Sequence, residues 1–258
     1  MYIDTHAHLY LNTYKNDVND VIKRAQDNFI KKIFLPNIDM STIHDMLNLC
    51  NRFPRYLFPM IGIHPNSIKQ DFETEIKAFD KEIATNPKKY IAIGEIGIDL
   101  YRNSKYLDNQ KKAFKHQIET AIKLDMPIVI HTRDSFDVTI KILDEYKNHK
   151  LKGVFHCFTG NETEAKNVID RGFKLGIGGV VTFKNSKLSS TLSKISLDDI
   201  VLETDAPFLT PDPYRGKRNE SSYMPLIAKK LSEIYSTNIL NVSQVTLKNT
   251  NSIFYTDD

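Results

Sequence analysis

Long hydrophobic runs are missing from this chain of 258 residues. No window comes near the roughly 18 uncharged apolar residues of a membrane-spanning helix, so no membrane partner is expected. The N-terminus lacks the basic stretch and apolar run of a secretory signal peptide. Cysteine is scarce: Cys50 and Cys157 lie far apart and form no C-x-x-C pair. This usage favours a reducing, cytoplasmic setting.

Nucleotide-binding signatures are also absent. No G-x-G-x-x-G follows the first expected strand and there is no P-loop, which argues against a doubly wound sheet. No repeat, low-complexity tract or linker marks a second domain, so residues 1–258 are expected to form one domain and to act as a monomer. The net charge of +3 is too small to demand or exclude nucleic acid.

Short β-branched runs alternate with longer amphipathic segments, which is typical of parallel βα units. The expected strands are 2–6, 32–36, 57–63, 90–93, 127–131, 153–156, 173–177 and 200–203. Helices are expected at about 17–28, 41–52 with Ser41 as N-cap, 72–84, 107–124, 136–146, 162–171, 188–195, 223–235 and 243–254. Eight strands alternating with helices in this length predict an α/β fold, a single TIM (β/α)8 barrel.

The stretch Asp4-Thr5-His6-Ala7-His8 lies on the first expected strand. Strand side chains alternate faces, so His6 and His8 would point the same way, with Asp4 on that face one layer deeper. Two imidazoles could then grip one metal ion. An H-x-H pair is a weak signal alone, and other strands must supply further ligands.

Other strand ends carry the same residue types. In a TIM barrel the chemistry lies at the C-terminal ends of the strands. His64, Glu95, His131, His156 and Asp205 follow or close expected strands three, four, five, six and eight. Alternation supports an inward aim, because each shares a face with apolar neighbours; on strand four these would be Ile91 and Ile93.

Buried imidazoles and carboxylates must be paired or must coordinate a metal. Imidazole with carboxylate suits Zn, Mn or Fe, and an oxygen-rich face suits Mg or Mn. Glu95 could bridge two ions about 3.5–4 Å apart, the spacing of two-metal phosphoryl-transfer sites. The sequence therefore predicts two divalent ions, Mg²⁺, Mn²⁺ or Zn²⁺, at this end of the barrel.

The chain resembles the TatD family of metal-dependent hydrolases, a branch of the amidohydrolase-like TIM barrels. The motifs that carry the resemblance are Asp4-Thr-His6-Ala-His8, Gly62-Ile-His64-Pro65, Gly94-Glu95-Ile-Gly97-Ile-Asp99, His131-Thr-Arg133-Asp134, His156-Cys-Phe-Thr-Gly160, Glu203-Thr-Asp205-Ala-Pro207 and Arg215-Gly-Lys-Arg218-Asn-Glu220. The resemblance implies metal ligands at His6, His8, Glu95, His131, His156 and Asp205. It also implies hydrolysis of DNA phosphodiesters, often as a magnesium-dependent 3′-5′ exonuclease.

Two positions bear on which branch of these barrels is present. Glu95 occupies the kind of place where many other amidohydrolases carry a metal-bridging carboxylated lysine, which argues against an amide or lactone hydrolase. Ser221 follows the Asn-Glu pair where family members commonly have proline, a change that bears on the stiffness of the loop and leaves the metal site untouched.

Our hypothesis assigns one ion to His6, His8 and Asp205, the second to His131 and His156, and the bridge to Glu95. The ions would lower the pKa of a shared water, which attacks the phosphate. Asp205 would orient or deprotonate that water.

His64 would face the substrate phosphate or protonate the leaving group; the alternative is a turn histidine that only hydrogen-bonds the backbone. Glu203 and Asp4 would orient the ligand histidines as acceptors behind them.

Three arginines are candidate phosphate contacts. Arg133 could clamp a phosphate bidentately or pair with a neighbouring carboxylate. Arg215 and Arg218 lie in a basic loop beside Asp205 that is either a phosphate site or a solvated face, and phosphate contacts there would be salt-sensitive. Cys157 is expected to point away from His156 into buried packing.

Three functions remain open at this point. The leading interpretation is a deoxyribonuclease acting on single-stranded or frayed DNA. The same site could instead cleave an ester, such as a misattached D-amino acid on tRNA, because activated hydroxide attacks phosphorus or carbonyl carbon alike. The third is an inactive barrel used as a binding module, which the intact set of six ligand-type residues argues against.

Overall fold

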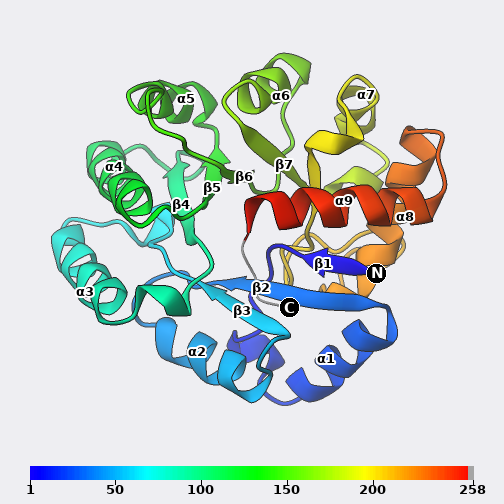
Figure 1. Ribbon diagram of the computed structural model, residues 1–258, viewed down its shortest axis with the longest axis horizontal. Coiled ribbons are helices and arrows are strands. Elements are labelled where there is room, and N and C mark those ends of the chain that lie inside the picture. The colour runs from blue at the N-terminus through cyan, green and yellow to red at the C-terminus, as the bar shows by residue number, and fades with distance from the viewer. Residues whose placement is uncertain (255–258) are drawn as a thin grey trace.

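The computed structural model describes residues 1–254; the last four residues of the expected 1–258 domain lie outside the described residues. Eight strands run parallel to their neighbours, with helices outside them (Figure 1). The strands are β1 (Tyr2–Asp4), β2 (Ile30–Pro36), β3 (Leu57–Met60), β4 (Ile93–Asp99), β5 (Ile128–Arg133), β6 (Gly153–Phe155), β7 (Phe173–Ile177) and β8 (Ile200–Leu202).

The strands follow one another in chain order around a ring. β1 to β3 form one sheet and β4 to β8 another. Isolated parallel bridges join them, Ile61 with Ile93 on one side and Ala7 with Ala206 on the other. This arrangement confirms the predicted α/β barrel, in which the C-terminal ends of all strands face the same way.

The helices agree with the predicted pattern, but some of them begin or end at other residues than expected, because capping residues set those ends. They are α1 (Val18–Asp27), α2 (Ile43–Arg52), α3 (Phe72–Thr85), α4 (Leu107–Leu124), α5 (Phe136–Asp144), α6 (Glu162–Ile169), α7 (Leu188–Leu192), α8 (Met224–Ile234) and α9 (Ile239–Ile253). Thr42, not Ser41, stands at the start of α2. α9 begins before the expected residue 243 because the Asn238 side chain accepts the backbone N–H of Asn241.

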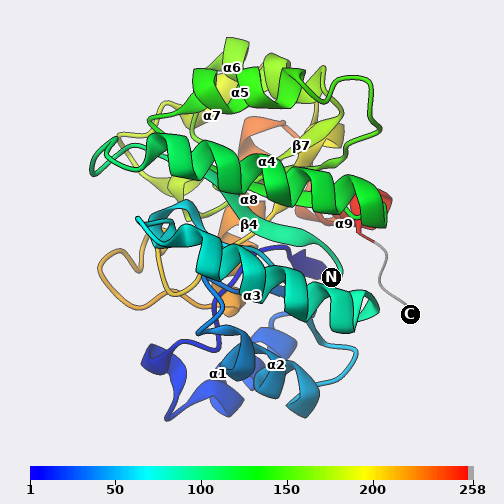
Figure 2. The same ribbon diagram turned by 90° about the vertical axis from the view of Figure 1, so that its left-hand side faces the viewer.

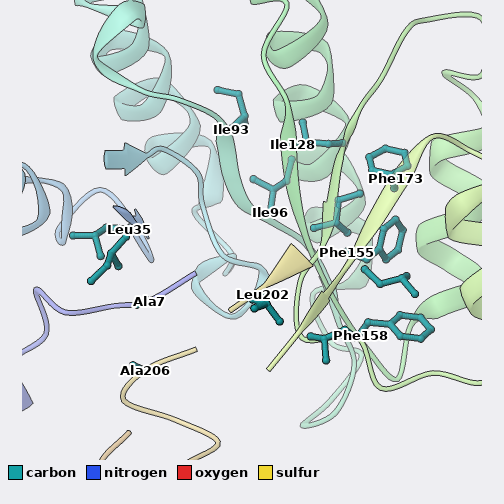
Figure 3. Close-up of a cluster of buried hydrophobic side chains, with 14 of the residues drawn as sticks. Ala7, Leu35, Ile93, Ile96, Ile128, Phe155, Phe158, Phe173, Leu202 and Ala206 are labelled. Atoms are coloured by element: carbon teal, nitrogen blue, oxygen red, sulfur yellow. The ribbon is translucent and has the colours of Figure 1, made fainter. Parts of the chain in front are cut away.

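Strand β4 departs from the prediction. It extends from Ile93 to Asp99, beyond the expected end at residue 93. Ile93 packs in the helix-facing cluster with Ile96 and Ile128 (Figure 3), so the expectation that Ile93 and Glu95 share a face is wrong. The register shifts between Gly94 and Ile96, which leaves Glu95 as an extra, unpaired residue.

Because of this bulge, both Gly94 and Glu95 face the interior of the barrel, between the outward-facing Ile93 and Ile96. Gly94 makes the close approach to β5 possible, because a Cβ there would lie 2.6 Å from the Cβ of Val129. Gly97 lies at φ 146°, where a side chain is strained, and its Cβ would lie 1.9 Å from the carbonyl oxygen of His131. The two glycines of Gly94-Glu95-Ile96-Gly97 thus permit the backbone that delivers the carboxylate.

The space inside the barrel is packed with side chains, as expected for this fold. Its cluster includes Ile3, Phe34, Met60, Val129, Val154 and Val201, one from each of six strands. Phe254, after α9, closes the end where the strands begin, its ring 5.0 Å from that of Phe34. The floor of the site is therefore a close-packed apolar plug.

Among residues 1–254, no helix is both long enough and apolar enough to cross a bilayer.

Removing the Phe254 ring should destabilise the protein without altering the strand-end site. Phe254→Ala deletes a ring that is 2% exposed, and we expect a loss of about 3–5 kcal/mol in the free energy of unfolding. Urea unfolding followed by circular dichroism measures it. Leu240→Ala, at a position 69% exposed on α9, is the matched control. Equal stabilities of the two variants would contradict the plug.

Candidate metal centre

The strand ends bring the predicted site residues into one buried cluster. His6, His8, Glu95 and His156 are each at most 6% exposed, and His64, His131 and Asp205 are partly buried. They come from the ends of six strands, which only the closed ring of the barrel brings together. All seven predicted residues therefore meet at one place.

Two histidines and an aspartate from opposite ends of the chain form one side of the cluster. His6 Nε2 and His8 Nε2 face each other at 3.2 Å. Asp205 Oδ1 lies 3.8 Å from the first and 3.6 Å from the second. All three donor atoms lie within 4.8 Å of one another, a spacing that suits one metal ion. This group agrees with the first predicted set.

The Glu95 carboxylate lies between two sets of imidazoles. Its Oε2 is 3.3 Å from His6 Nε2 and 3.8 Å from His8 Nε2. Its Oε1 is 2.7 Å from His131 Nδ1 and 3.0 Å from His156 Nε2. Each oxygen therefore faces a different pair of ring nitrogens, as a bridging ligand requires.

In His8 and His131, the ring nitrogen that faces away from the centre of the cluster lies beside a hydrogen-bond acceptor. His8 Nδ1 lies 3.1 Å from the carbonyl oxygen of Pro36, which can only accept, so Nδ1 carries the proton and Nε2 keeps its lone pair. His131 Nε2 lies 3.0 Å from Asp99 Oδ2, which leaves Nδ1 aimed at Glu95. Such partners fix the tautomer and orientation of metal-binding imidazoles.

Asp99 is a site residue that the sequence interpretation missed. It is 3% exposed and also accepts from Asn66 Nδ2 at 3.1 Å and from the backbone N–H of Tyr101 at 2.9 Å. Burial opposes its ionisation, yet the hydrogen bonds from His131 and Tyr101 lower its pKa to about 2. Its place four residues after Glu95 on one strand was the available signal.

Asp4 does not orient a histidine ring as expected. It is fully buried, and its carboxylate accepts from the backbone N–H of Thr204 at 3.0 Å and from Thr204 Oγ1 at 2.6 Å. It also lies 3.3 Å from the backbone nitrogen of His6. Asp4 therefore fastens the segment after β8, which carries Asp205, to the strand end that carries His6.

Glu203 agrees better with its predicted role behind the ligands. Its Oε1 lies 3.3 Å from His156 Nδ1 and accepts from the backbone N–H of Cys157 at 2.6 Å. Its Oε2 is buried without a hydrogen-bond partner. Glu203 also forms a group with His6 and His156 in which one possible metal-binding atom from each residue lies within 4.8 Å of the others. The side chain thus stands directly behind the His156 ring.

Burial and mutual repulsion shift the ionisation of the cluster. Burial raises the pKa of Asp205 to about 8 and lowers that of His8 to about 4. Burial holds the pKa of His6 well below its usual value. Burial alone would raise the pKa of Glu95, but the surrounding imidazoles, His156 first, outweigh it and hold it well below the usual range. Burial would also lower the pKa of His131 and of His156, but Asp99 and Glu95 raise that of His131, and Glu95 and Glu203 hold that of His156 well above its usual value. The cluster thus keeps lone pairs on neutral rings at His6 and His8 and favours protons on His131 and His156 beside an anionic Glu95.

His64 differs from the other histidines in its tautomer. The backbone N–H of Asn66 donates to His64 Nδ1 at 3.0 Å, so in the neutral ring Nε2 carries the proton. Nε2 lies 3.4 Å from Glu95 Oε1, and the ring is 4.4 Å from that of His131. His64 therefore presents an N–H to the cluster, which suits a donor better than a ligand.

The three predicted arginines have different surroundings. Arg218 makes a two-pronged ion pair with Asp17 and donates to the Thr13 carbonyl oxygen at 2.6 Å, which favours a structural role over the expected phosphate contact. Arg133 and Arg215 are exposed and instead stack on aromatic rings, those of Tyr101 and Phe183. Among residues 1–254, no carboxylate pairs with Arg133, so the alternative of an ion pair is not observed.

Cys157 and Ser221 also differ from simple expectations. Cys157 is only partly buried and lines a pocket of about 540 Å³ with Thr132 and Phe158, so the expectation of buried packing is wrong. Ser221 is fully buried at the start of η6 (Ser221–Tyr223), where its hydroxyl faces the Asp4 carboxylate. The residue at the position where proline was expected therefore lies beside the buried Asp4.

The donor set fits divalent metal. Buried ring nitrogens that face one another with lone pairs, around a carboxylate, repel each other unless a cation lies between them. The parallel barrel and this strand-end cluster together define a metal-dependent hydrolase. The chain belongs to the TatD related DNase family, whose model matches residues 3–255.

Similar proteins cover nearly the whole chain. An uncharacterized metal-dependent hydrolase, YabD of Bacillus subtilis, is 36% identical, with 98% of this chain and 99% of that protein covered. The protein named 3′-5′ ssDNA/RNA exonuclease TatD of Pectobacterium parmentieri is 30% identical, with 97% and 98% covered. The crystal structure of YjjV, a TatD homologue from Escherichia coli K12, matches with a TM-score of 0.92 at 25% identity, covering 99% of this chain and 98% of that one.

Neutralising Asp99 should weaken metal binding at the His131 side of the cluster. Asp99→Asn keeps the size of the side chain but removes the anion that holds His131 Nε2, and we expect one ion to bind about 10- to 100-fold more weakly. Isothermal titration of the metal-free protein with Mn²⁺ measures the affinity of each ion. Asp108→Asn, on the exposed start of α4, is the control. Unchanged binding of both ions would exclude this role.

Proposed function

We propose that this protein is a metal-dependent deoxyribonuclease that removes nucleotides from the 3′ ends of single-stranded or frayed DNA. The observation that carries the proposal is the Glu95 carboxylate, whose two oxygens face two different sets of imidazoles. Paired divalent ions on a shared carboxylate are a recurring solution for phosphoryl transfer. The Pectobacterium relative named as a 3′-5′ exonuclease supports the same class of substrate.

In this proposal His6, His8 and Asp205 hold one ion, His131 and His156 hold a second, and Glu95 contacts both. Mg²⁺, Mn²⁺ and Zn²⁺ are the candidates, since the donors are imidazoles and carboxylates. When bound, the ions would polarise the phosphate and supply a nucleophilic water at neutral pH. Two side chains of the protein would act on the attacking water and on the leaving oxygen.

Asp205 is placed to take a proton from the attacking water. Its carboxylate lies at a strand end beside His6 and His8, its Oδ1 3.8 Å and 3.6 Å from their Nε2 atoms. A carboxylate in this position can orient a water held at the first ion and accept its proton. Asp4 holds the backbone of this segment through Thr204, so the direction of Asp205 is fixed from behind.

His64 is placed to donate a hydrogen bond to the substrate phosphate or to the leaving oxygen. The Asn66 N–H fills the lone pair of Nδ1, so the Nε2 proton points into the cluster toward Glu95. A neutral imidazole N–H at this position can stabilise the negative charge that develops on the departing 3′ oxygen, which then takes its proton from solvent. A turn histidine with only a backbone contact would not face Glu95.

Loss of either candidate carboxylate should abolish metal-dependent turnover. Glu95→Ala and Asp205→Ala each remove a donor that is expected to stabilise the transition state by several kcal/mol, so the rate should fall about 10²-fold or more. Release of nucleotides from end-labelled single-stranded DNA with Mg²⁺ or Mn²⁺ measures it. Glu73→Ala, exposed on α3, is the control.

The same assay distinguishes the competing functions. A D-aminoacyl-tRNA incubated in parallel tests the esterase, and turnover of that substrate alone would contradict the nuclease. A tenth of the wild-type rate in both carboxylate variants would contradict the assignment of the site, and no metal-dependent turnover of any substrate would favour a binding module.

Replacing His64 should slow cleavage in a way that depends on the leaving group. We expect His64→Ala to lower kcat on DNA about 10²- to 10³-fold, because the departing alkoxide loses the hydrogen bond that stabilises its charge. A p-nitrophenyl phosphodiester, whose leaving group is a stable anion, should lose less than about tenfold by the same argument. His116→Ala, in a surface ion pair with Asp80, is the control. Equal losses on both substrates would exclude a hydrogen bond from His64 to the leaving group.

A further inference from the structure

We propose that two arginine–aromatic stacks, Tyr101–Arg133 and Phe183–Arg215, are docking platforms for a single DNA strand on opposite sides of the candidate metal centre. This inference rests on the proposed nuclease function and names the surface that selects its substrate. In each stack the guanidinium carbon lies 3.5 Å from the centre of the aromatic ring. Both arginines are exposed, and Tyr101 is 58% exposed.

The geometry of a stack suits nucleic acid. A guanidinium that lies flat on a ring keeps its N–H groups free at its edge, where they can bind a phosphate bidentately. Its outer face can stack on an unpaired base, and so can the exposed ring of Tyr101. Each platform therefore offers both contacts that non-specific single-strand binding uses.

Two segments at the strand ends repeat the same composition. Residues 101–106 (Tyr-Arg-Asn-Ser-Lys-Tyr) precede α4, and residues 214–217 (Tyr-Arg-Gly-Lys) follow β8. We call them the two mouth segments. In each, a lysine lies over a tyrosine ring, Lys105 over Tyr106 at 4.9 Å and Lys217 over Tyr214 at 5.5 Å.

The cations of this surface lack acidic partners. Within residues 1–254, no carboxylate forms an ion pair with five of them: Arg102, Lys105, Arg133, Arg215 and Lys217. Nearby arginines behave differently, since Arg24 pairs with Glu220 and Arg218 with Asp17. Positive charge that is not neutralised internally favours phosphates.

Exposed apolar side chains gather at the same end of the barrel. Of the seven large ones exposed in residues 1–254, four lie here: Tyr101, Phe208, Leu209 and Tyr214. Phe208 is 50% exposed and its ring lies 6.2 Å from that of His8, so an aromatic face reaches the candidate metal centre itself. Exposed apolar groups concentrated beside a site indicate that a ligand covers them.

The barrel places the two platforms across from each other. β4 and β8 are four strands apart in a ring of eight, and both mouth segments follow the C-terminal ends of these strands. Figure 2 shows the loop after β8 and the start of α4 on the left-hand side, away from the two termini. A strand bound on both platforms must cross Glu95 and Asp205, which lie between them.

A single strand fits this surface better than a duplex, because stacking needs bases that are not paired. The test uses Tyr101→Ala, which removes a ring, and Arg133→Lys and Arg215→Lys, which keep the charge but lose the flat stack. Phe29→Ala and Arg55→Lys, on the far end of the barrel, are matched controls. Two measurements are needed: one with a DNA strand, which reaches the platforms, and one with a small phosphodiester, which reports on bond cleavage alone.

We expect each platform variant of the metal-loaded enzyme to lower kcat/KM for a short single-stranded DNA about tenfold, mainly through KM, as loss of one stacked base predicts. Turnover of bis(p-nitrophenyl) phosphate, which is too small to reach the platforms, should be unchanged. Binding of a labelled phosphorothioate single strand by anisotropy should weaken in parallel, and a duplex of the same length should bind more weakly than the single strand.

The outcomes separate the two proposals. If wild type cleaves single-stranded DNA and the platform variants bind and cleave it like the controls, the platforms are excluded and the nuclease stands. If wild type turns over only the small diester or only an aminoacyl ester, the nuclease fails; unchanged strand binding by the variants then excludes the platforms independently. Equal binding of duplex and single strand would also overturn the platforms.

Discussion

The position of the Glu95 carboxylate among five imidazoles is the arrangement on which the rest of the site depends. A buried anion needs cations or N–H donors around it, and buried imidazoles need acceptors or a metal. Glu95 satisfies both needs from the middle of the cluster. It reaches that place because β4 carries one extra residue, which turns two consecutive positions into the barrel. The glycines on either side make this backbone possible.

The side chains around that cluster differ in role according to their depth in the barrel. Apolar side chains such as Phe34 and Val129 fill the barrel below and exclude water from beneath the cluster. Asp99, Glu203 and the Pro36 carbonyl hold the outer nitrogens of the histidines one layer above. Exposed rings and guanidiniums lie at the surface. A rigid interior thus presents preorganised donors beneath the surface that a substrate must cross.

The sequence was sufficient for features that depend on local rules. Alternation and the strand-end rule place His6, His8, His131 and His156 correctly, and the βα rhythm predicts the barrel. Features that depend on tertiary neighbours were not accessible. The bulge broke the simple alternation around Glu95, and the partner of Asp4 lies 200 residues away. Likewise Arg215 and Arg218 are near neighbours in one basic loop, but only Arg218 forms an ion pair with Asp17. That difference depends on the folded structure and cannot be inferred from the loop sequence.

The bond between Asp4 and Thr204 has a consequence for how the protein matures. His6 and His8 leave the ribosome first, whereas Asp205 arrives some 200 residues later on the segment that Asp4 must bind. Closing the ring and completing the first group of donors are therefore one event. A nascent or truncated chain that lacks the β8 segment has no complete group of that kind, so stable metal uptake there must await synthesis of the segment that carries Asp205.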